Sequence, residues 1–312
     1  MNLLIQYTLI FASVLMLVAL GGCFSERSGI VNIALEGIMV LGALGGALVM
    51  SFLPVSVGPF VMVLAAVGAS VLMGALCSLL LAVAAIGFKA DQTITGTAIN
   101  MLATAATTVG VKAMNTSLTG GNTSEIDYTQ SRDLILVTNK GFELSWFTII
   151  AVIALVATYF VLFKTRFGLR LRACGEHPQA ADSVGISVSK MRYSGVLLSG
   201  VLGGIGGITY ITAGGGKWLF ENGISGFGFL AMAVMIFGGW HPLKIALASL
   251  LFGFLRALGN VYTGFDFLAE MNIPSVVYNM MPYVISLVVL ILTSKNSRAP
   301  KAAGIPYDKG QR

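Results

Sequence analysis

Long apolar stretches, separated by short polar ones, run through the whole chain. Each is near the length of about 20 residues that a helix needs to cross the hydrocarbon core of a bilayer. We expect spanning helices at about residues 2–22, 30–50, 59–86, 92–111, 144–163, 193–213, 224–239, 243–262 and 275–293. The pattern predicts an all-α polytopic membrane protein with about nine transmembrane helices.

The apolar pattern also repeats within the chain. GIVNIALEGIMVLGALGGALV is echoed by GISGFGFLAMAVMIFGG, and ITGTAINML is echoed by PSVVYNMMP, which aligns Asn100 with Asn279. A single helix between two sets of four would make the halves run in opposite directions, as in inverted-repeat transporters. We expect one transmembrane domain over residues 1–312, made of a first repeat (1–111), an external loop (112–143), a linking helix (144–163), a cytoplasmic loop (164–192), a second repeat (193–293) and a cytoplasmic tail (294–312).

Composition and charge placement support a membrane protein and orient it. The chain is 56% hydrophobic and only 10% charged, with a mean hydropathy of +0.87. In this arrangement 14 of the 19 basic residues fall on one side: Arg27, Lys89, six in residues 164–192, Lys244 and five in residues 294–312. The positive-inside rule makes that side cytoplasmic, so we expect the N-terminus outside and the C-terminus inside.

Few residues could support catalysis or metal binding. The three cysteines show no CxxC spacing, the two histidines are isolated, and no GxxxxGK[ST] phosphate loop is present. We therefore expect neither an enzyme nor a cofactor or metal site. The net charge of +6 comes mainly from the predicted inner loops and tail, which favours contact with membrane lipid over nucleic acid.

Residues 164–192 form the longest charged interruption. Pro178 suits the first turn of a short helix and Gly185 suits its end. A cytoplasmic helix held between two membrane halves could receive force from a soluble motor protein. The alternative is a solvated basic loop lying beside anionic lipid.

Polar residues inside the predicted helices indicate a second site. Asn32 and Glu36 lie in the second stretch, and Asn100 lies among many threonines in the fourth. Because polar groups are costly at that depth, they should face protein or a water-filled path. Glu36 could instead cap or brace a broken helix, and the threonines could bond to their own helix.

Four segments resemble the inner-membrane permeases of ABC importers for nucleosides and simple sugars, within the larger group of ribose and branched-chain amino-acid permeases. They are FSERSGIVNIALEG, LRACGEHPQAADSVGISVSKMRYSGVLLSG, GFGFLAMAVMIFGGWHP and the GIPY of the tail. The resemblance implies a cytoplasmic (inner) membrane protein of a bacterium that pairs with a second permease subunit as a heterodimer. It also implies a cytoplasmic ABC ATPase and an external solute-binding lipoprotein as partners. By the same resemblance, the helix that docks on the ATPase is expected at residues 175–186, with Gly175, Glu176, Pro178, Ala181, Asp182 and Gly185 as coupling residues.

The predicted function is the permease subunit of an ATP-driven importer that forms half of the translocation path for nucleosides. An uncharged nucleoside needs carboxamides, hydroxyls and aromatic faces. The candidate path residues of that character are Asn32, Glu36, Asn100, Phe227, Phe229 and Asn279. The phenylalanines could instead serve packing, and the asparagines could only join helices. The alternatives are a simple-sugar permease and a stand-alone secondary transporter coupled to protons through Glu36.

Overall fold

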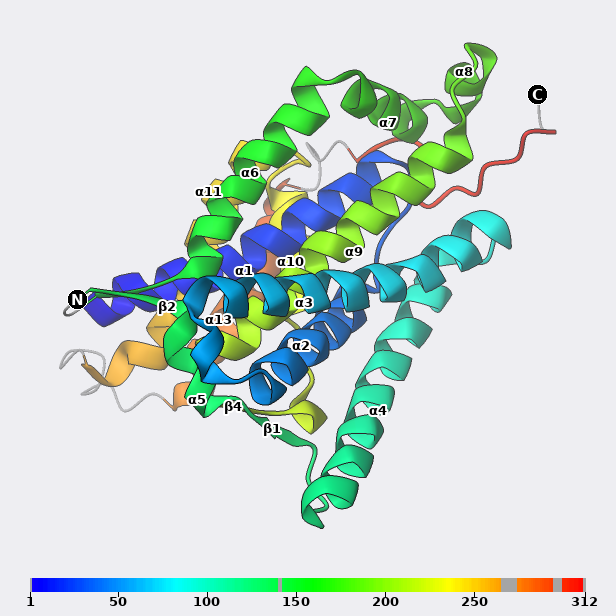
Figure 1. The fold of residues 1–312 in the computed structure, drawn as a ribbon. Coiled ribbons are helices and arrows are strands. Elements are labelled where there is room, and N and C mark those ends of the chain that lie inside the picture. The colour runs from blue at the N-terminus through cyan, green and yellow to red at the C-terminus, as the bar shows by residue number, and fades with distance from the viewer. Residues whose placement is uncertain (1, 140–141, 265–273, 294–298, 311–312) are drawn as a thin grey trace.

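The computed structural model describes residues 2–139, 142–264, 274–293 and 299–310 (Figure 1). Its helices are α1 (Asn2–Arg27), α2 (Leu35–Phe52), α3 (Pro59–Ala82), α4 (Gln92–Thr119), α5 (Thr129–Arg132), α6 (Trp146–Lys164), α7 (Arg166–Glu176), α8 (Pro178–Ser183), α9 (Val188–Ala213), α10 (Phe227–Phe237), α11 (Pro242–Val261) and α13 (Ser275–Thr293). The strands are β1 (Glu125–Asp127), β2 (Leu136–Asn139), β3 (Phe142–Ser145) and β4 (Lys217–Leu219). A short π-helix, Val83–Gly87, extends α3.

The chain is a multi-pass helical membrane protein. Among the described residues, seven helices are long and apolar enough to cross a membrane. The apolar helix α10 has only 11 residues, and α13 includes residues whose side chains are not described. The count of nine and the inverted-repeat layout therefore remain predictions.

Helix α1 lies at the centre and is almost fully buried over its second half, where α9 and α11 pack along it. Helices α2 and α3 pack on the other side of α9, and the closest approaches use small residues. A Cβ placed on Gly204 of α9 would lie 2.3 Å from the Ser70 carbonyl oxygen of α3, and one on Gly42 of α2 would lie 2.4 Å from the Gly204 Cα. The glycines of α9 thus let it pack closely against its neighbours, because larger side chains would separate the backbones.

The two ends of the helical bundle differ. Helices α7 and α8 and the chain's C-terminus lie together at one end, and the strands and α5 lie toward the other (Figure 1). At the strand end, β1 pairs with β4 and β2 pairs with β3, both antiparallel. The buried Tyr128 anchors this cap, since its hydroxyl donates a 2.9 Å hydrogen bond to the Ile211 carbonyl of α9. The described part of the segment predicted as an external loop is thus held in place by strand pairing, of β1 with β4 and of β2 with β3.

Five predicted helices have wrong boundaries. Helix α1 continues to Arg27 and does not end near residue 22, and α9 begins at Val188 and not at residue 193. Helix α2 begins at Leu35 and not near residue 30, so Asn32 lies before the helix and Glu36 lies in its first turn. Helix α4 continues to Thr119, because the predicted loop start at residue 112 is still helical. Helix α10 covers only Phe227–Phe237 of the stretch predicted over 224–239, since Gly226 at φ +80° and Gly238 bound it.

Candidate functional site

The chain between α1 and α2 is not helical over residues 28–34 and is held in place by side chains of α4. The Gln92 Oε1 atom accepts a 2.7 Å bond from the Val31 N–H. The Asn100 Oδ1 atom accepts a 2.7 Å bond from the Gly37 N–H, and its Nδ2 atom donates a 2.8 Å bond to the Ile33 carbonyl. Gln92 and Asn100 are eight residues apart, so they share one helix face. A broken helix at membrane depth requires such partners, because no water is present to satisfy its backbone.

Asn32 occupies the middle of this break and is 1% exposed. Its Nδ2 atom donates a 2.8 Å bond to the Ser199 Oγ atom of α9. Its Oδ1 atom has no hydrogen-bond partner among the described residues. A buried acceptor without a partner costs free energy, so this oxygen is suited to bind water or a ligand.

Glu36 joins the starts of α2 and the short helix α10. Its Oε1 and Oε2 atoms accept bonds of 2.8 Å and 2.7 Å from the N–H groups of Gly226 and Gly228 at the beginning of α10. A carboxylate is stabilised at a helix N-terminus by the unpaired N–H groups and the helix dipole. The approach is close: a Cβ on Gly228 would lie 2.5 Å from the Glu36 backbone nitrogen. The geometry matches the alternative in which Glu36 braces a broken helix, and it also places the carboxylate beside a groove.

An open groove of about 660 Å³ lies where α2, α4 and α10 meet. Three of the six predicted path residues line it: Glu36, Asn100 and Phe229. The remaining lining residues, which the sequence-based selection missed, are Thr97, Met101, Thr104, Ala105, Thr108, Val109 and Glu221. The run of threonines in the fourth apolar stretch is the sequence feature that indicates the α4 wall of the groove. Several hydroxyls bond to their own helix, as Thr97 does to the Thr93 carbonyl at 2.8 Å, so the wall of the groove is mainly apolar.

The other three predicted path residues do not line this groove. Phe227 is fully buried, with its ring 4.4 Å from the ring of Tyr210, so it belongs to the core. Asn32 lies behind the groove wall on the side of α9. Asn279 lies in α13, and its side chain is outside the described residues.

The family described as "Branched-chain amino acid transport system / permease component" matches residues 4–294. The chain belongs to this permease family. No solved structure matches it significantly.

Two curated relatives match this chain over its full length, and a third matches most of it. The guanosine ABC transporter permease protein NupQ of Bacillus subtilis is 42% identical over 100% of this chain and 98% of the relative. The nucleoside ABC transporter permease protein NupC of Lactococcus lactis is 40% identical over the same shares. The putative glucose ABC transporter permease protein TsgC13 of Haloferax volcanii is 31% identical over 82% of this chain and 76% of the relative.

The predicted short helix in the permease's basic loop is confirmed as α8, and Gly185 follows it at φ +82°. The predicted coupling residues fall into two groups. Gly175, Pro178 and Ala181 are buried, whereas Gly185 is exposed and Glu176 and Asp182 are half-buried. A Cβ on Gly175 would lie 2.3 Å from the Arg27 carbonyl oxygen, so this glycine fits the loop against α1. The sequence did not reveal that residues 166–176 are also helical, as α7.

The exposed side of this loop is formed by residues the prediction did not select. They are His177, Gln179, Ala180, Ser183 and Val184. Val184 is 74% exposed, a large apolar side chain turned away from the permease. A partner that binds here would contact these residues, and the buried ones would hold the helix in place.

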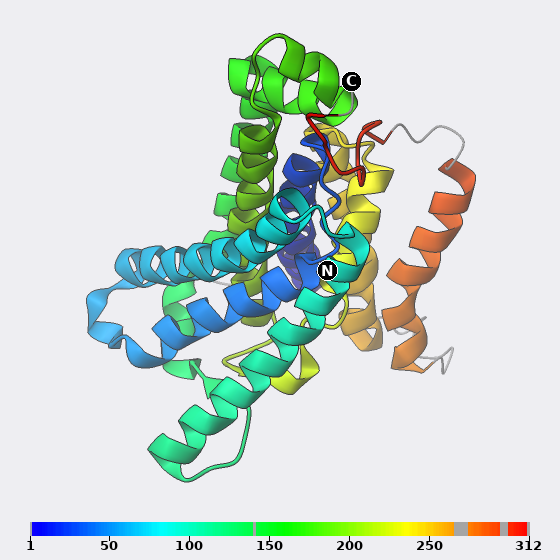
Figure 2. The same cartoon turned by 90° about the vertical axis from the view of Figure 1, so that its right-hand side faces the viewer.

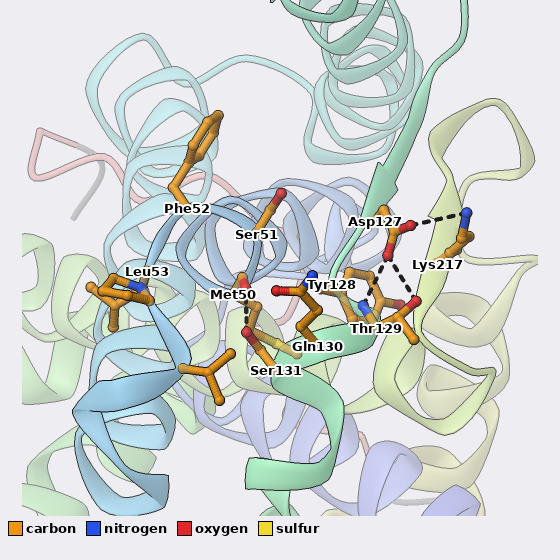
Figure 3. Close-up of a pocket in the computed structure, with 12 residues that line it drawn as sticks. Met50, Ser51, Phe52, Leu53, Asp127, Tyr128, Thr129, Gln130, Ser131 and Lys217 are labelled. Carbon is orange, nitrogen blue, oxygen red and sulfur yellow. Dashed lines mark hydrogen bonds and ion pairs between the residues drawn. The ribbon is translucent and has the colours of Figure 1, made fainter. Parts of the chain in front are cut away.

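At the other end the permease has a recess of about 590 Å³ between the end of α2, α5 and β4 (Figure 3). Asp127 stands on its rim, 2.9 Å from the Lys217 Nζ atom, and accepts bonds from the Thr129 N–H and hydroxyl. The Thr129 N–H, followed by Lys217, lowers the pKa of Asp127 to about 2. The Ser131 hydroxyl donates a 2.6 Å bond to the Met50 carbonyl and fixes α5 against α2. Asp127 therefore stays ionised at any physiological pH.

Proposed function

We propose that this permease is one of two membrane subunits of an ATP-driven importer and provides half of a translocation path for nucleosides. The observation that carries the proposal is the groove at which the N-terminal ends of α2 and α10 meet within the membrane. Transporters place broken helix ends beside the solute, because free backbone groups can bind it without permanent charge. The correspondence of the α2 and α10 regions in the two predicted repeats supports the same path.

The chemistry of the groove favours a nucleoside. Phe229 offers an exposed ring on which a flat base can stack, and the threonine wall and Glu36 offer hydrogen-bond partners to a ribose. The unpaired Oδ1 atom of Asn32 is a further acceptor for a path that opens toward α9. Two full-length relatives at 40% and 42% identity carry nucleoside or guanosine in their names.

A simple sugar is the second candidate solute. The relative named as a putative glucose permease matches 82% of this chain, and hydroxyl and carboxylate groups serve a sugar as well as a ribose. The exposed Phe229 decides in favour of the nucleoside, since a flat base uses a whole aromatic face.

We assign each proposed partner to one surface of the permease. The ATPase docks on the exposed side of α8, which carries Gln179, Ala180, Ser183 and Val184. The external lipoprotein docks over the recess with Asp127 and Lys217 on its rim. The second permease, a different chain as in the predicted heterodimer, completes the path on the open side of the groove. This arrangement puts α8 and the tail in the cytoplasm and the N-terminus outside, as the basic residues predict.

Uptake by the reconstituted complex tests the proposal. Vesicles that contain both permeases, the ATPase and the lipoprotein should accumulate labelled guanosine only when ATP is supplied on the side of the membrane that carries the ATPase. Excess ribose should compete poorly and a protonophore should have no effect. Accumulation of ribose or glucose in place of guanosine would establish the sugar alternative, and uptake that a protonophore abolishes without any need for ATP would establish a secondary transporter.

A further inference from the structure

The C-terminal segment after α13 folds back onto the permease. Residues 299–310, which include the GIPY sequence at Gly304–Tyr307, lie beside α7 and α8 at the predicted cytoplasmic end (Figure 2). Pro300 and Ala302 are buried although the segment has no helix or strand. An irregular tail is ordered only where its backbone finds partners and its side chains find packing.

Two backbone bonds of this tail connect regions that are far apart in the sequence. The Ala302 N–H donates a 2.8 Å bond to the Gly175 carbonyl, next to α8. The Gly304 N–H donates a 3.2 Å bond to the Gly29 carbonyl, at the start of the break that leads to Asn32. Gly304 has φ +78°, a conformation that side chains disfavour. Three tail residues thus bridge the loop of α8 and the break before α2.

Three further contacts fix the tail beyond this bridge. The Arg192 Nη1 atom donates a 3.0 Å bond to the Ile305 carbonyl. Tyr307 packs on the small apolar cluster of Cys174, Ala181 and Val188, which also holds the buried side of α8. The Asp308 Oδ1 atom lies 3.2 Å from the Lys89 Nζ atom, in the turn between α3 and α4. Lys89 lies just before α4, whose Gln92 and Asn100 support the break, so the tail also contacts the turn that leads into this support.

We infer that residues 299–310 form a strap that transmits movement of α8 to the broken segment 28–34 and thereby to the solute path. The strap rests on the proposed docking of an ATPase at α8, and it adds a positioning element outside both the docking surface and the groove. A connection through space is needed because α8 and the break are far apart in the chain, with α2 to α7 between them. Packed side chains and hydrogen bonds between two such elements can make them respond together. The tail connects the region of α8 to the break through Ala302 and Gly304. Independently of the tail, Gly175 packs directly on Arg27 at the end of α1.

The test uses the assembled complex in vesicles with the double variant Tyr307→Ala, Asp308→Asn. Lys301→Ala is the matched control, because Lys301 is an exposed residue of the same tail. One readout is solute imported per ATP hydrolysed. The other is the reaction rate of Val31→Cys, at the break, with a hydrophilic thiol reagent with and without ATP. The three native cysteines are buried, so they contribute little labelling.

The double variant is expected to keep its ATP hydrolysis, while solute per ATP falls at least about fivefold, the lower end of typical coupling between sites. It should also lose the ATP-dependent change in labelling, which the control keeps. Coupling and labelling equal to the control would overturn the strap. Should the double variant assemble poorly, Asp308→Asn alone, compared at equal complex yield, decides by the same two readouts. Absence of guanosine uptake by the unmodified complex would refute the proposed function, whereas the ATP-dependent labelling would still test the strap.

Discussion

Phe227 and Phe229 are two positions apart and have opposite surroundings. Phe227 is fully buried among aromatic rings, and Phe229 is 47% exposed in the groove. Neighbours i and i+2 on a helix point to different faces, so one residue lies in the core and the other lines the groove. The pattern of apolar residues alone does not distinguish them.

Substitution of these two residues by alanine should separate stability from transport. Phe227→Ala leaves a cavity and should lower the free energy of unfolding by about 3 kcal/mol or more. Phe229→Ala should leave thermal unfolding in detergent nearly unchanged and reduce guanosine uptake. Equal unfolding temperatures for the two variants would contradict the burial that separates them.

Gly228 is required by the approach of α10 to Glu36. Gly228→Ala would place a Cβ 2.5 Å from the Glu36 backbone nitrogen, so α2 and α10 must move apart and lose the bonds to the carboxylate. We expect lower thermal stability and lower uptake. Gly68→Ala is the control, because nothing lies within 4 Å of a Cβ there. It should be neutral or stabilise by about 0.5–1 kcal/mol, as alanine does in helices.

At the scale of elements, the molecule combines long buried helices with short ones that end inside it. Helix α4 is mostly exposed, yet Gln92 and Asn100 on its inner face hold the break before α2. Helix α8 has only six residues and depends on its buried face for its position. A short helix can transmit force only if one side is fixed to the permease and the other is free for a partner.

The two faces of α8 should therefore respond differently to a charge. Ala180→Glu, on the exposed face, should leave the permease stable and reduce transport that depends on the ATPase. Ala181→Glu buries an unpaired carboxylate among Cys174 and Val188, so it should lower thermal stability of the permease even without partners. Melting of the isolated permease and uptake by the complex are the measurements. A normal melting temperature for Ala181→Glu would contradict the buried position.

At the scale of the whole molecule, the predicted orientation places the strand-bearing cap outside and α7, α8 and the tail inside. Asn122→Cys and Lys301→Cys lie at exposed positions of these two ends. In intact cells an impermeant thiol reagent should label Asn122→Cys, and Lys301→Cys should react only after the membrane is opened. Labelling of both from outside would refute the orientation.

The sequence by itself determined the membrane class, most helix positions and the short helix α8, because the length of apolar stretches and the placement of proline and glycine are local properties. Polar and aromatic groups in apolar helices are conspicuous, and three of the path candidates chosen for that reason, Glu36, Asn100 and Phe229, line the groove. Their contact with a solute stays a prediction. The start of α2 at Leu35 escaped it, because residues 30–34 are as apolar as a helix requires and their backbone is satisfied by side chains of α4.

Only the tertiary structure decided which candidate residues line the groove and which are buried in the protein. Glu36 contacts backbone groups 190 and 192 positions away, and the tail bonds to Gly29 and Gly175. Contacts of that range depend on how helices cross, and no local pattern encodes the crossing. For the same reason Phe227, selected for its aromatic ring, and Ala181, selected from the family resemblance, are both buried. The exposed face of α8 could be recognised only after the helix was seen against the permease.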